Sequence, residues 1–269
     1  MSSIKDVRLG IIIPAYNEEK RIRRTLIEYC EFYSTLKNKK EIKDVKVLVV
    51  LNNCSDNTLE IVKKSQKEFS NLDYLDLTLG GKGYAIMEGF KEFLSKYKGD
   101  NILIGFVDAD MATPPKEFYK LVKNIGYYDG IIASRYVTGS IVDPKQSFQR
   151  ILASRIFNFL IRTLFLMHYK DTQCGAKLFK RKLIEKITPE LKITKWAFDV
   201  NLLYLCKKTG AKVKEDATMW QDKEYSKINL KKAGTQMFFS LIRLRIVYSP
   251  FKSLIKIYDK MPSWIKIKI

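Results

Sequence analysis

The sequence predicts an α/β fold in which helices flank a mainly parallel β-sheet. Short apolar runs rich in β-branched residues alternate with segments whose apolar residues recur at helical spacing. Strands that alternate with helices favour a parallel sheet joined by right-handed crossovers. A chain of 269 residues with 46% hydrophobic residues can build one large domain of this kind.

The first strand is expected at residues 9–13, an apolar run that ends at Pro14. A helix follows over residues 18–36, where apolar side chains recur at helical spacing. Further strands are expected at 45–51, 74–79, 102–107 and 130–134, with helices from Thr58, from the Gly-rich turn to about Leu94, and from Pro114 or Pro115. Either Ser55 or Asp56 is a suitable N-cap for the second helix.

The excess of basic residues indicates which classes of molecule the protein attracts. There are 49 Lys and Arg against 29 Asp and Glu, and the formal net charge of +20 attracts phosphate-rich ligands, nucleic acid or acidic lipid surfaces. A lysine-rich solvated surface without a specific partner explains the same excess. The single histidine, His168, excludes mechanisms that need two histidines.

The spacing of the cysteines and the length of the apolar segments predict the cellular compartment of the protein. The four cysteines are scattered without metal-ligand spacing, and the polar N-terminal stretch does not resemble a signal peptide. We therefore expect a reducing, cytoplasmic compartment. A spanning helix needs about 18 apolar residues, and the nearest candidate, residues 151–167, is interrupted by Arg155 and Arg162. The sequence predicts no transmembrane span.

Polar motifs follow three of the predicted strands, at residues 14–18, 52–56 and 108–110. In a parallel sheet these positions lie at the carboxyl edge, where ligands bind. Asp108 and Asp110 place two carboxylates there, and a hard cation such as Mg²⁺ or Mn²⁺ combines carboxylates with substrate phosphates. The ion would neutralise a departing diphosphate. One aspartate would then bind the metal while the other holds a ribose hydroxyl or water, and the alternative is a capped turn with solvated aspartates.

Other candidate residues stand in later motifs. Lys82 lies in a Gly-Gly-Lys-Gly turn suited to the approach of a phosphate, although a plain turn has the same composition. Arg135 offers a planar guanidinium that suits a diphosphate, or it is an ordinary surface arginine. The motif at 171–175 is too particular for a spacer. Asp199 stands among apolar residues, which suits a general base, a group that orients the acceptor, or the N-cap of a helix over 200–206.

Taken together, these motifs resemble the family 2 inverting glycosyltransferases with a GT-A (Rossmann-like) fold, and above all their dolichyl-phosphate glucosyltransferase branch. The motifs stand in the family's order between about residues 9 and 227: 14–18, Gly81-Lys82-Gly83 with Ala85 and Gly89, 108–110 with 112–114, Ser134-Arg135, 171–175 with 177–179, 196–200, and Trp220 with Ser226-Lys227. The motifs at 171–175 and 196–200 are the most specific to the lipid-phosphate branch.

The resemblance implies an enzyme that transfers a hexose, foremost glucose from UDP-glucose, to a polyprenyl or dolichyl phosphate, with inversion and with Mg²⁺ or Mn²⁺ as cofactor. It implies nucleotide contacts from Pro14, Tyr16, Asn17, Glu18, Asn52 and Asp56, ribose and metal contacts from Asp108 and Asp110, and diphosphate or acceptor-phosphate contacts from Lys82 and Arg135. We expect Asp199, Arg135 and Asp171 to be the catalytic residues.

The chain departs from the family pattern at three places. Leu51-Asn52-Asn53-Cys54 stands where the family usually shows Asp-Asp-Gly-Ser, so the acid expected to face uracil is missing. Met111 replaces a usual glycine, and Ala176 a usual phenylalanine. A polyprenyl monophosphate is already anionic and needs positioning more than deprotonation, so Asp199 would orient a group instead of acting as a strong base.

Two segments, 146–169 and 234–269, combine apolar side chains with flanking cations. Such segments suit interfacial helices on an anionic leaflet, and core-packing helices or a dimer interface have the same composition. We expect a catalytic domain over 1–233 and a basic membrane-associating segment over 234–269. The protein would then attach peripherally to the cytoplasmic face of a membrane.

Three other functions compete with this interpretation. A glycosyltransferase of the same fold could use a soluble or glycan acceptor, which requires a true general base. A nucleotidyltransferase also uses paired aspartates on a parallel sheet. A nucleic-acid-binding module would explain the charge, but the sequence holds no recognisable nucleic-acid motif, so no nucleic-acid partner is expected.

Overall fold

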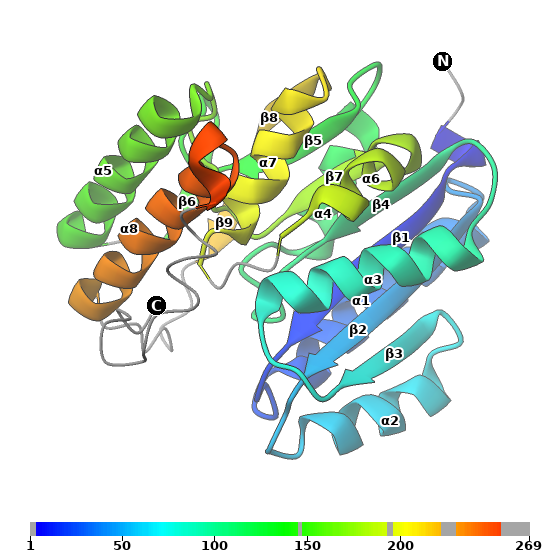
Figure 1. The fold of residues 1–269 in the computed structure, drawn as a ribbon. Coiled ribbons are helices and arrows are strands. Elements are labelled where there is room, and N and C mark those ends of the chain that lie inside the picture. Colours follow the sequence, from blue (N-terminus) through cyan, green and yellow to red (C-terminus); the bar gives the residue numbers. More distant parts are fainter. Residues whose placement is uncertain (1–3, 145–146, 193–195, 222–229, 254–269) are drawn as a thin grey trace.

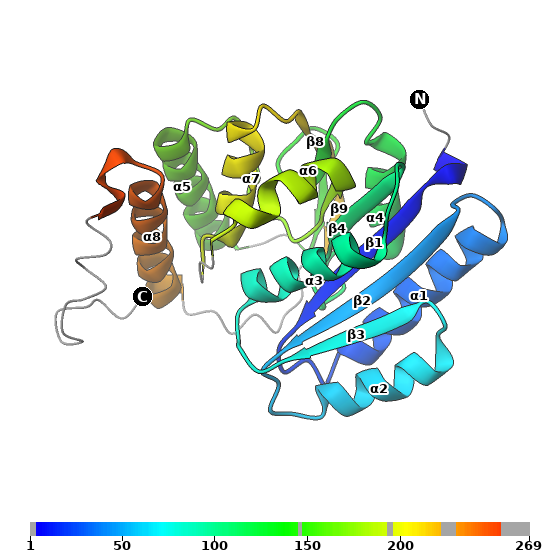
Figure 2. The ribbon, with the colours of Figure 1, turned by 45° about the vertical axis from the view of Figure 1, so that its right-hand side comes forward.

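The computed structural model describes residues 4–144, 147–192, 196–221 and 230–253. Within these ranges a seven-stranded sheet lies between two layers of helices, as Figures 1 and 2 show. The predicted α/β fold with a mainly parallel sheet is confirmed. Gln146, Ser226, Lys227 and the tail beyond residue 253, which carried some of the expectations above, lie outside the described residues.

The strands of the large sheet are β1 (Arg8–Ala15), β2 (Asp44–Asn52), β3 (Leu72–Leu77), β4 (Ile102–Phe106), β5 (Gly130–Ser134), β7 (Lys177–Lys180) and β8 (Val213–Ala217). Their order is β3-β2-β1-β4-β7-β5-β8, and β7 alone runs antiparallel to its neighbours β4 and β5. β6 (Ile141–Asp143) and β9 (Met219–Gln221) form a separate two-stranded sheet. Every residue of β4 and β5 is buried, as expected for strands covered on both faces.

The helices cover the sheet in two layers. One face carries α1 (Ile22–Asn38), α2 (Thr58–Glu68) and α4 (Pro115–Asn124), and the other carries α3 (Lys82–Lys96), α6 (Arg181–Ile187) and α7 (Phe198–Lys208). Successive side chains of β1 point to opposite faces of the sheet, so Leu9 and Ile11 enter the first core and Ile12 enters the second. α5 (Phe148–Phe165) and α8 (Leu230–Val247) lie side by side beyond α7 (Figures 1 and 2).

Several helix ends differ from the expectation. α5 is shorter than the predicted 146–169, because Leu166 adopts a left-handed backbone (φ 52°) that ends the helix. The N-cap position of α2 is Asn57, although the Oδ1 atom of Asp56 accepts the Thr58 N–H at 3.0 Å. Asp199 lies within the first turn of α7 and is not its N-cap.

The antiparallel β7 has a consequence for the site. Its first residue, Lys177, pairs with Phe106 at the end of β4 and with Ile132 near the end of β5. An antiparallel strand enters the sheet where its parallel neighbours leave it. The motif at 171–175, which precedes β7, therefore reaches the same carboxyl edge as the motifs that follow the parallel strands.

The C-terminal helix α8 is part of this packing. The predicted boundary between residues 233 and 234 falls inside α8, and Leu241 and Leu244 are fully buried in the core that α7 also enters. None of the helices in the described ranges is long and apolar enough to cross a bilayer.

Candidate active site

A cleft of about 1300 Å³ opens at the carboxyl edge of the sheet. At the sheet edge its lining comes from the ends of β1 and β2, the loops after β1, β2, β4 and β5, and the start of α3; it includes Pro14 and the polar residues Tyr16, Glu18, Arg21, Asn52, Asn53, Lys82, Asp108, Asp110 and Arg135. Its apolar lining comes from α5, the segment leading into α7, and α8: Ala153, Ile156, Phe157, Leu160, Trp196, Phe198, Met237 and Phe238. One cavity thus joins a charged region to an apolar one.

Asp108 and Asp110 lie together in the cleft after β4, as predicted. The Nζ atom of Lys82, the first residue of α3, lies 2.5 Å from Oδ1 of Asp108. Burial and then the adjacent Asp108 carboxylate raise the pKa of Asp110, although the charges of Arg21 and Lys82 act in the opposite direction. This pair of carboxylates suits a divalent metal ion.

The donor set fits such an ion in part. Two carboxylates are available, and the described residues contain no cluster of three or more Asp, Glu, His or Cys side chains able to hold a metal. Mg²⁺ and Mn²⁺ accept one or two carboxylates together with phosphate oxygens and water. Asp108 and Asp110 would therefore hold the ion together with the diphosphate of a substrate.

Two residues, Asn53 in the cleft wall and Met111 directly after Asp110 in the sequence, have a left-handed backbone where the resembled family usually has glycine. Asn53 has φ 59° and Met111 has φ 61°. Asparagine adopts this conformation readily, whereas for methionine it costs about 1 kcal/mol. Met111 is 6% exposed, and the burial of its side chain offsets this cost. Leu51, at the position of the missing acid, is fully buried and presents no polar group to the cleft.

The predicted nucleotide-binding residues fall into two groups. Pro14, Tyr16, Glu18 and Asn52 line the cleft, whereas Asn17 and Asp56 do not. Oδ1 of Asn17 accepts the Ser55 N–H at 2.8 Å, and Oδ2 of Asp56 accepts the Glu19 N–H at 3.1 Å. Asn17 and Asp56 therefore join the loops that follow β1 and β2.

Asn52 also holds the site together. Its Nδ2 donates to the Ala15 carbonyl at 2.8 Å, and its Oδ1 accepts the Gly81 N–H at 3.0 Å. The side chain fixes the Gly-rich turn before α3 against the end of β1. Glu18 is bound by the guanidinium of Arg21, a cleft residue that the sequence analysis did not identify.

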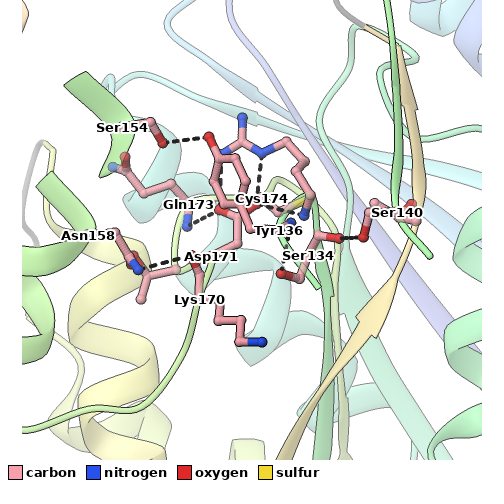
Figure 3. A network of polar contacts seen from close by, with 12 residues as sticks. Ser134, Tyr136, Ser140, Ser154, Asn158, Lys170, Asp171, Gln173 and Cys174 are labelled. Carbon is pink, nitrogen blue, oxygen red and sulfur yellow. Dashed lines mark hydrogen bonds and ion pairs between the residues drawn. The ribbon is translucent and has the colours of Figure 1, made fainter. Parts of the chain in front are cut away.

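Arg135 and Asp171 form a bidentate ion pair. Nε and Nη2 of Arg135 donate to Oδ2 and Oδ1 of Asp171 at 2.7 and 3.0 Å, and the Arg135 backbone N–H adds a third bond at 3.0 Å. Figure 3 shows Asp171 within the surrounding polar network. Burial alone would raise the pKa of Asp171, but the charge and hydrogen bonds of Arg135 outweigh it and lower the pKa. Arg135 lines the cleft and Asp171 does not, so Asp171 acts by holding Arg135.

Asp199 lines the cleft and is paired with Lys177, which the sequence analysis placed in a family motif without giving it a role. The fully buried Lys177 donates from Nζ to Oδ1 of Asp199 and to the Cys174 carbonyl, each at 2.6 Å. Burial alone would raise the pKa of Asp199, but the charges of Lys177 and Lys82 lower it. Asp199 is therefore a weak base. The signal in the sequence was a lysine at the start of the apolar run Lys177–Lys180.

Glycine is required at position 175 because the backbone there approaches the Asp108 carboxylate closely. A Cβ atom built on Gly175 would lie 2.0 Å from Oδ2 of Asp108, which is far inside van der Waals contact. The glycine in this motif allows the segment before β7 to pack directly against Asp108.

Comparison with known proteins agrees with this geometry. Residues 10–188 match the model of the glycosyl transferase family 2. The chain is 32% identical over 257 residues to a dolichyl-phosphate beta-glucosyltransferase of Dictyostelium discoideum, which covers 91% of this chain and 76% of the relative. It is 29% identical over 251 residues to the human dolichyl-phosphate beta-glucosyltransferase, over 90% and 76% of the two chains.

Solved structures share the fold. Glucosyl-3-phosphoglycerate synthase from Mycobacterium tuberculosis, in complex with Mn²⁺, UDP and phosphoglyceric acid, superimposes with a TM-score of 0.62 at 15% identity, over 91% of this chain and 80% of that chain. Staphylococcus aureus TarS has a TM-score of 0.53 at 18% identity, over 94% and 69%. The predicted GT-A fold is confirmed. With paired aspartates at the sheet edge and a family match over most of its length, this chain belongs to the family 2 glycosyltransferases.

Proposed function

We propose that this glycosyltransferase transfers a hexose, glucose from UDP-glucose, to a polyprenyl phosphate such as dolichyl phosphate. The observation that carries the proposal is the cleft, in which Asp108, Asp110 and Lys82 share one cavity with apolar side chains of α5 and α8. A nucleotide sugar matches the charged part, and a prenyl chain matches the apolar part. The names of the D. discoideum and human relatives support this choice of sugar and acceptor.

The part of the cleft proposed for the donor presents positive charge to a diphosphate. The start of α3 presents Gly81, Lys82 and Gly83 to the cleft, and a helix N-terminus with an added cation favours a diphosphate. A divalent ion on Asp108 and Asp110 would add Lewis-acid stabilisation of the leaving diphosphate. Lys82 supplies a second positive charge beside the same group, which lowers the energy of the developing anion.

The class of acceptor is inferred from the ion pair and the lowered pKa of Asp199. A hydroxyl acceptor needs a base, but Asp199 is paired with Lys177 at 2.6 Å and its pKa is lowered. A phosphate monoester already carries negative charge, so its oxygen can attack the anomeric carbon without a base. The new carbon–oxygen bond forms as the bond to the diphosphate breaks, and attack from the opposite face inverts the anomeric configuration. This supports a lipid phosphate over a soluble hydroxyl acceptor.

The same proposal includes peripheral attachment to an anionic membrane surface. Phe148, Leu152, Ile156 and Phe159 recur at helical spacing on α5 and are 77%, 47%, 55% and 66% exposed. Exposed Arg155 and Arg162 accompany them on the same helix. Apolar and cationic side chains on one exposed helix suit an interfacial position.

Vesicle flotation tests the attachment. The purified protein should float with vesicles that contain anionic lipid, and a Phe148→Ser/Phe159→Ser variant should remain at the bottom of the gradient. Tyr127→Ser, which removes a ring that is 65% exposed and lies between α4 and β5, is the control and should float. Equal flotation of all three proteins, or of none, would refute attachment through α5.

The reaction is tested with radiolabelled UDP- and GDP-sugars and a polyprenyl phosphate, with and without Mg²⁺ or Mn²⁺. Wild type should label the lipid from UDP-glucose when metal is present, and Asp110→Ala should lose this activity. Asp100→Ala, which changes an exposed aspartate outside the cleft, should keep it. Donor hydrolysis without labelled lipid would move the acceptor to another class. Labelling from a GDP-sugar alone would overturn the assignment of the base.

A further inference from the structure

The first half of α5 is not held in place by hydrophobic burial. The buried side chains of the helix are Asn158, Ile161 and Phe165, all in its second half. In the first half, Phe148 and Leu152 are largely exposed. Yet this half supplies Ala153, Ser154 and Ile156 to the cleft wall. Its position must depend on other contacts.

Tyr136, two residues after β5, provides such contacts. Its hydroxyl donates a hydrogen bond to Oγ of Ser154 at 2.9 Å, as Figure 3 shows. The guanidinium of Arg155 lies 4.3 Å from the centroid of its ring, within the range of a cation–π interaction. Two successive residues of α5 are thus bound by one side chain from the sheet.

The same ring contacts the active site. The guanidinium of Arg135 lies 5.4 Å from the ring centroid of Tyr136 and 5.2 Å from that of Trp220 in β9. Arg135 is itself fixed by the bidentate pair with Asp171. Trp220, Arg135, Tyr136 and Arg155 therefore form a continuous row of alternating rings and guanidinium groups from β9 to α5.

A second polar tie attaches the middle of the helix. Nδ2 of Asn158 donates to the carbonyls of Tyr169 and Lys170 at 3.1 and 2.9 Å, next to Asp171. This tie fixes α5 beside the segment that precedes β7, and the contacts of Tyr136 with Ser154 and Arg155 lie one turn nearer the start of the helix. The two ties lie side by side in Figure 3.

We propose that Tyr136 is a positioning residue that fixes the first half of α5 to Arg135 and thereby sets the acceptor side of the cleft. The inference rests on the proposed lipid-phosphate acceptor, because α5 lines the apolar part of the cleft and the donor motifs lie elsewhere. Loss of Tyr136 should weaken the use of the acceptor and leave the binding of the nucleotide unchanged.

The test compares Tyr136→Leu, which removes the hydrogen bond to Ser154 and the contacts of the ring with Arg155 and Arg135, with Tyr136→Phe and Ser154→Ala, which remove only the hydrogen bond. The KM for polyprenyl phosphate should rise about tenfold in Tyr136→Leu and about threefold in the other two. The Kd for UDP with Mn²⁺ should stay within about twofold of wild type in all three. The double variant Tyr136→Phe/Ser154→Ala should match the single ones, since each removes the same bond. Tyr127→Leu is the control.

Hydrogen–deuterium exchange gives a readout that does not depend on activity. Amides of residues 148–157 should exchange faster in Tyr136→Leu, and those of α7 should not change. Unchanged acceptor KM and unchanged exchange would overturn the inference, as would a rise in the Kd for UDP equal to the rise in acceptor KM. If Tyr136→Leu did not fold, the acceptor KM and the exchange rates of Ser154→Ala would test the inference. If wild type transferred no sugar to the lipid, the proposed function would fail while exchange still tested the role of Tyr136.

Discussion

Removal of Lys177 should expose how strongly the site depends on its buried charges. The change Lys177→Met keeps an unbranched side chain of similar length but removes the ammonium group, whose Nζ atom lies 2.6 Å from Oδ1 of Asp199. Breaking a buried ion pair from one side costs about 3–5 kcal/mol, because the other charge remains without a partner. Asp199 keeps 15% side-chain exposure and the nearby charge of Lys82, so we expect the lower end, about 3 kcal/mol at pH 8.

The loss should depend on pH in a defined direction. In wild type the lowered pKa of Asp199 stabilises the fold above the unfolded value of about 3.9, and this is lost as pH falls through the folded value. Without Lys177, burial is the main remaining influence and raises the pKa of Asp199. The folded variant then takes up a proton at lower pH and avoids a buried charge. The deficit should therefore be smaller at pH 5 than at pH 8, by about 1 kcal/mol or more.

Urea denaturation at both pH values measures these free energies of unfolding. Lys177→Met/Asp199→Asn should recover at least about half of the deficit, since no unpaired charge remains. Lys182→Met makes the same substitution at an exposed ion pair with Asp100, where both side chains are about 80% accessible, and should change stability by less than about 0.5 kcal/mol. A deficit below about 1 kcal/mol at pH 8, or one equal at both pH values, would refute the reasoning.

Three further predictions follow from single residues. Gly175→Ala should lower the transfer rate at least about tenfold with an unchanged circular dichroism spectrum, because its Cβ displaces Asp108; full activity would contradict this. Met111→Gly should lower the free energy of unfolding by about 1 kcal/mol in urea, since about 2 kcal/mol of lost burial exceeds about 1 kcal/mol of relieved strain. A more stable glycine variant would show that strain dominates. Asp199→Asn should lower turnover in the lipid-labelling assay without unfolding the protein, and full activity would remove Asp199 from the catalytic residues.

Local patterns were enough to predict the first half of the fold. β1, β2 and β4 are short apolar runs between helical segments, and in a parallel sheet the residues after each run must meet at one edge. The grouping of Asp108 and Asp110 with Asn52 and Tyr16 could therefore be inferred from periodicity alone. The roles of Asn17 and Asp56 could not, because both side chains serve the backbone of a neighbouring loop.

The second half of the site depends on one strand that local patterns do not orient. β7 is four residues long, and its antiparallel course is set by pairing with β4 and β5, far away in the sequence. That course brings Asp171 to Arg135 and Lys177 to Asp199. A pattern of apolar residues specifies that a strand forms, but the direction in which it enters a sheet is decided by tertiary contacts. The residues alone marked the motifs at 171–175 and 196–199 as unusual, but they did not show that the two motifs meet the carboxyl edge of the sheet.

Exposure decides which of the charges at the cleft can exchange partners with a substrate. Besides Arg21–Glu18, the described part of the chain holds three cation–carboxylate pairs there, and their side-chain exposures are 39% and 36% for Lys82 and Asp108, 12% and 2% for Arg135 and Asp171, and 0% and 15% for Lys177 and Asp199. An exposed ion pair contributes at most about 1 kcal/mol, so its opening is readily offset by a diphosphate and a metal ion. Opening a buried pair costs several times more. Lys82 and Asp108 can therefore separate when the donor binds, whereas the other two pairs stay closed and hold Arg135 and Asp199 in place.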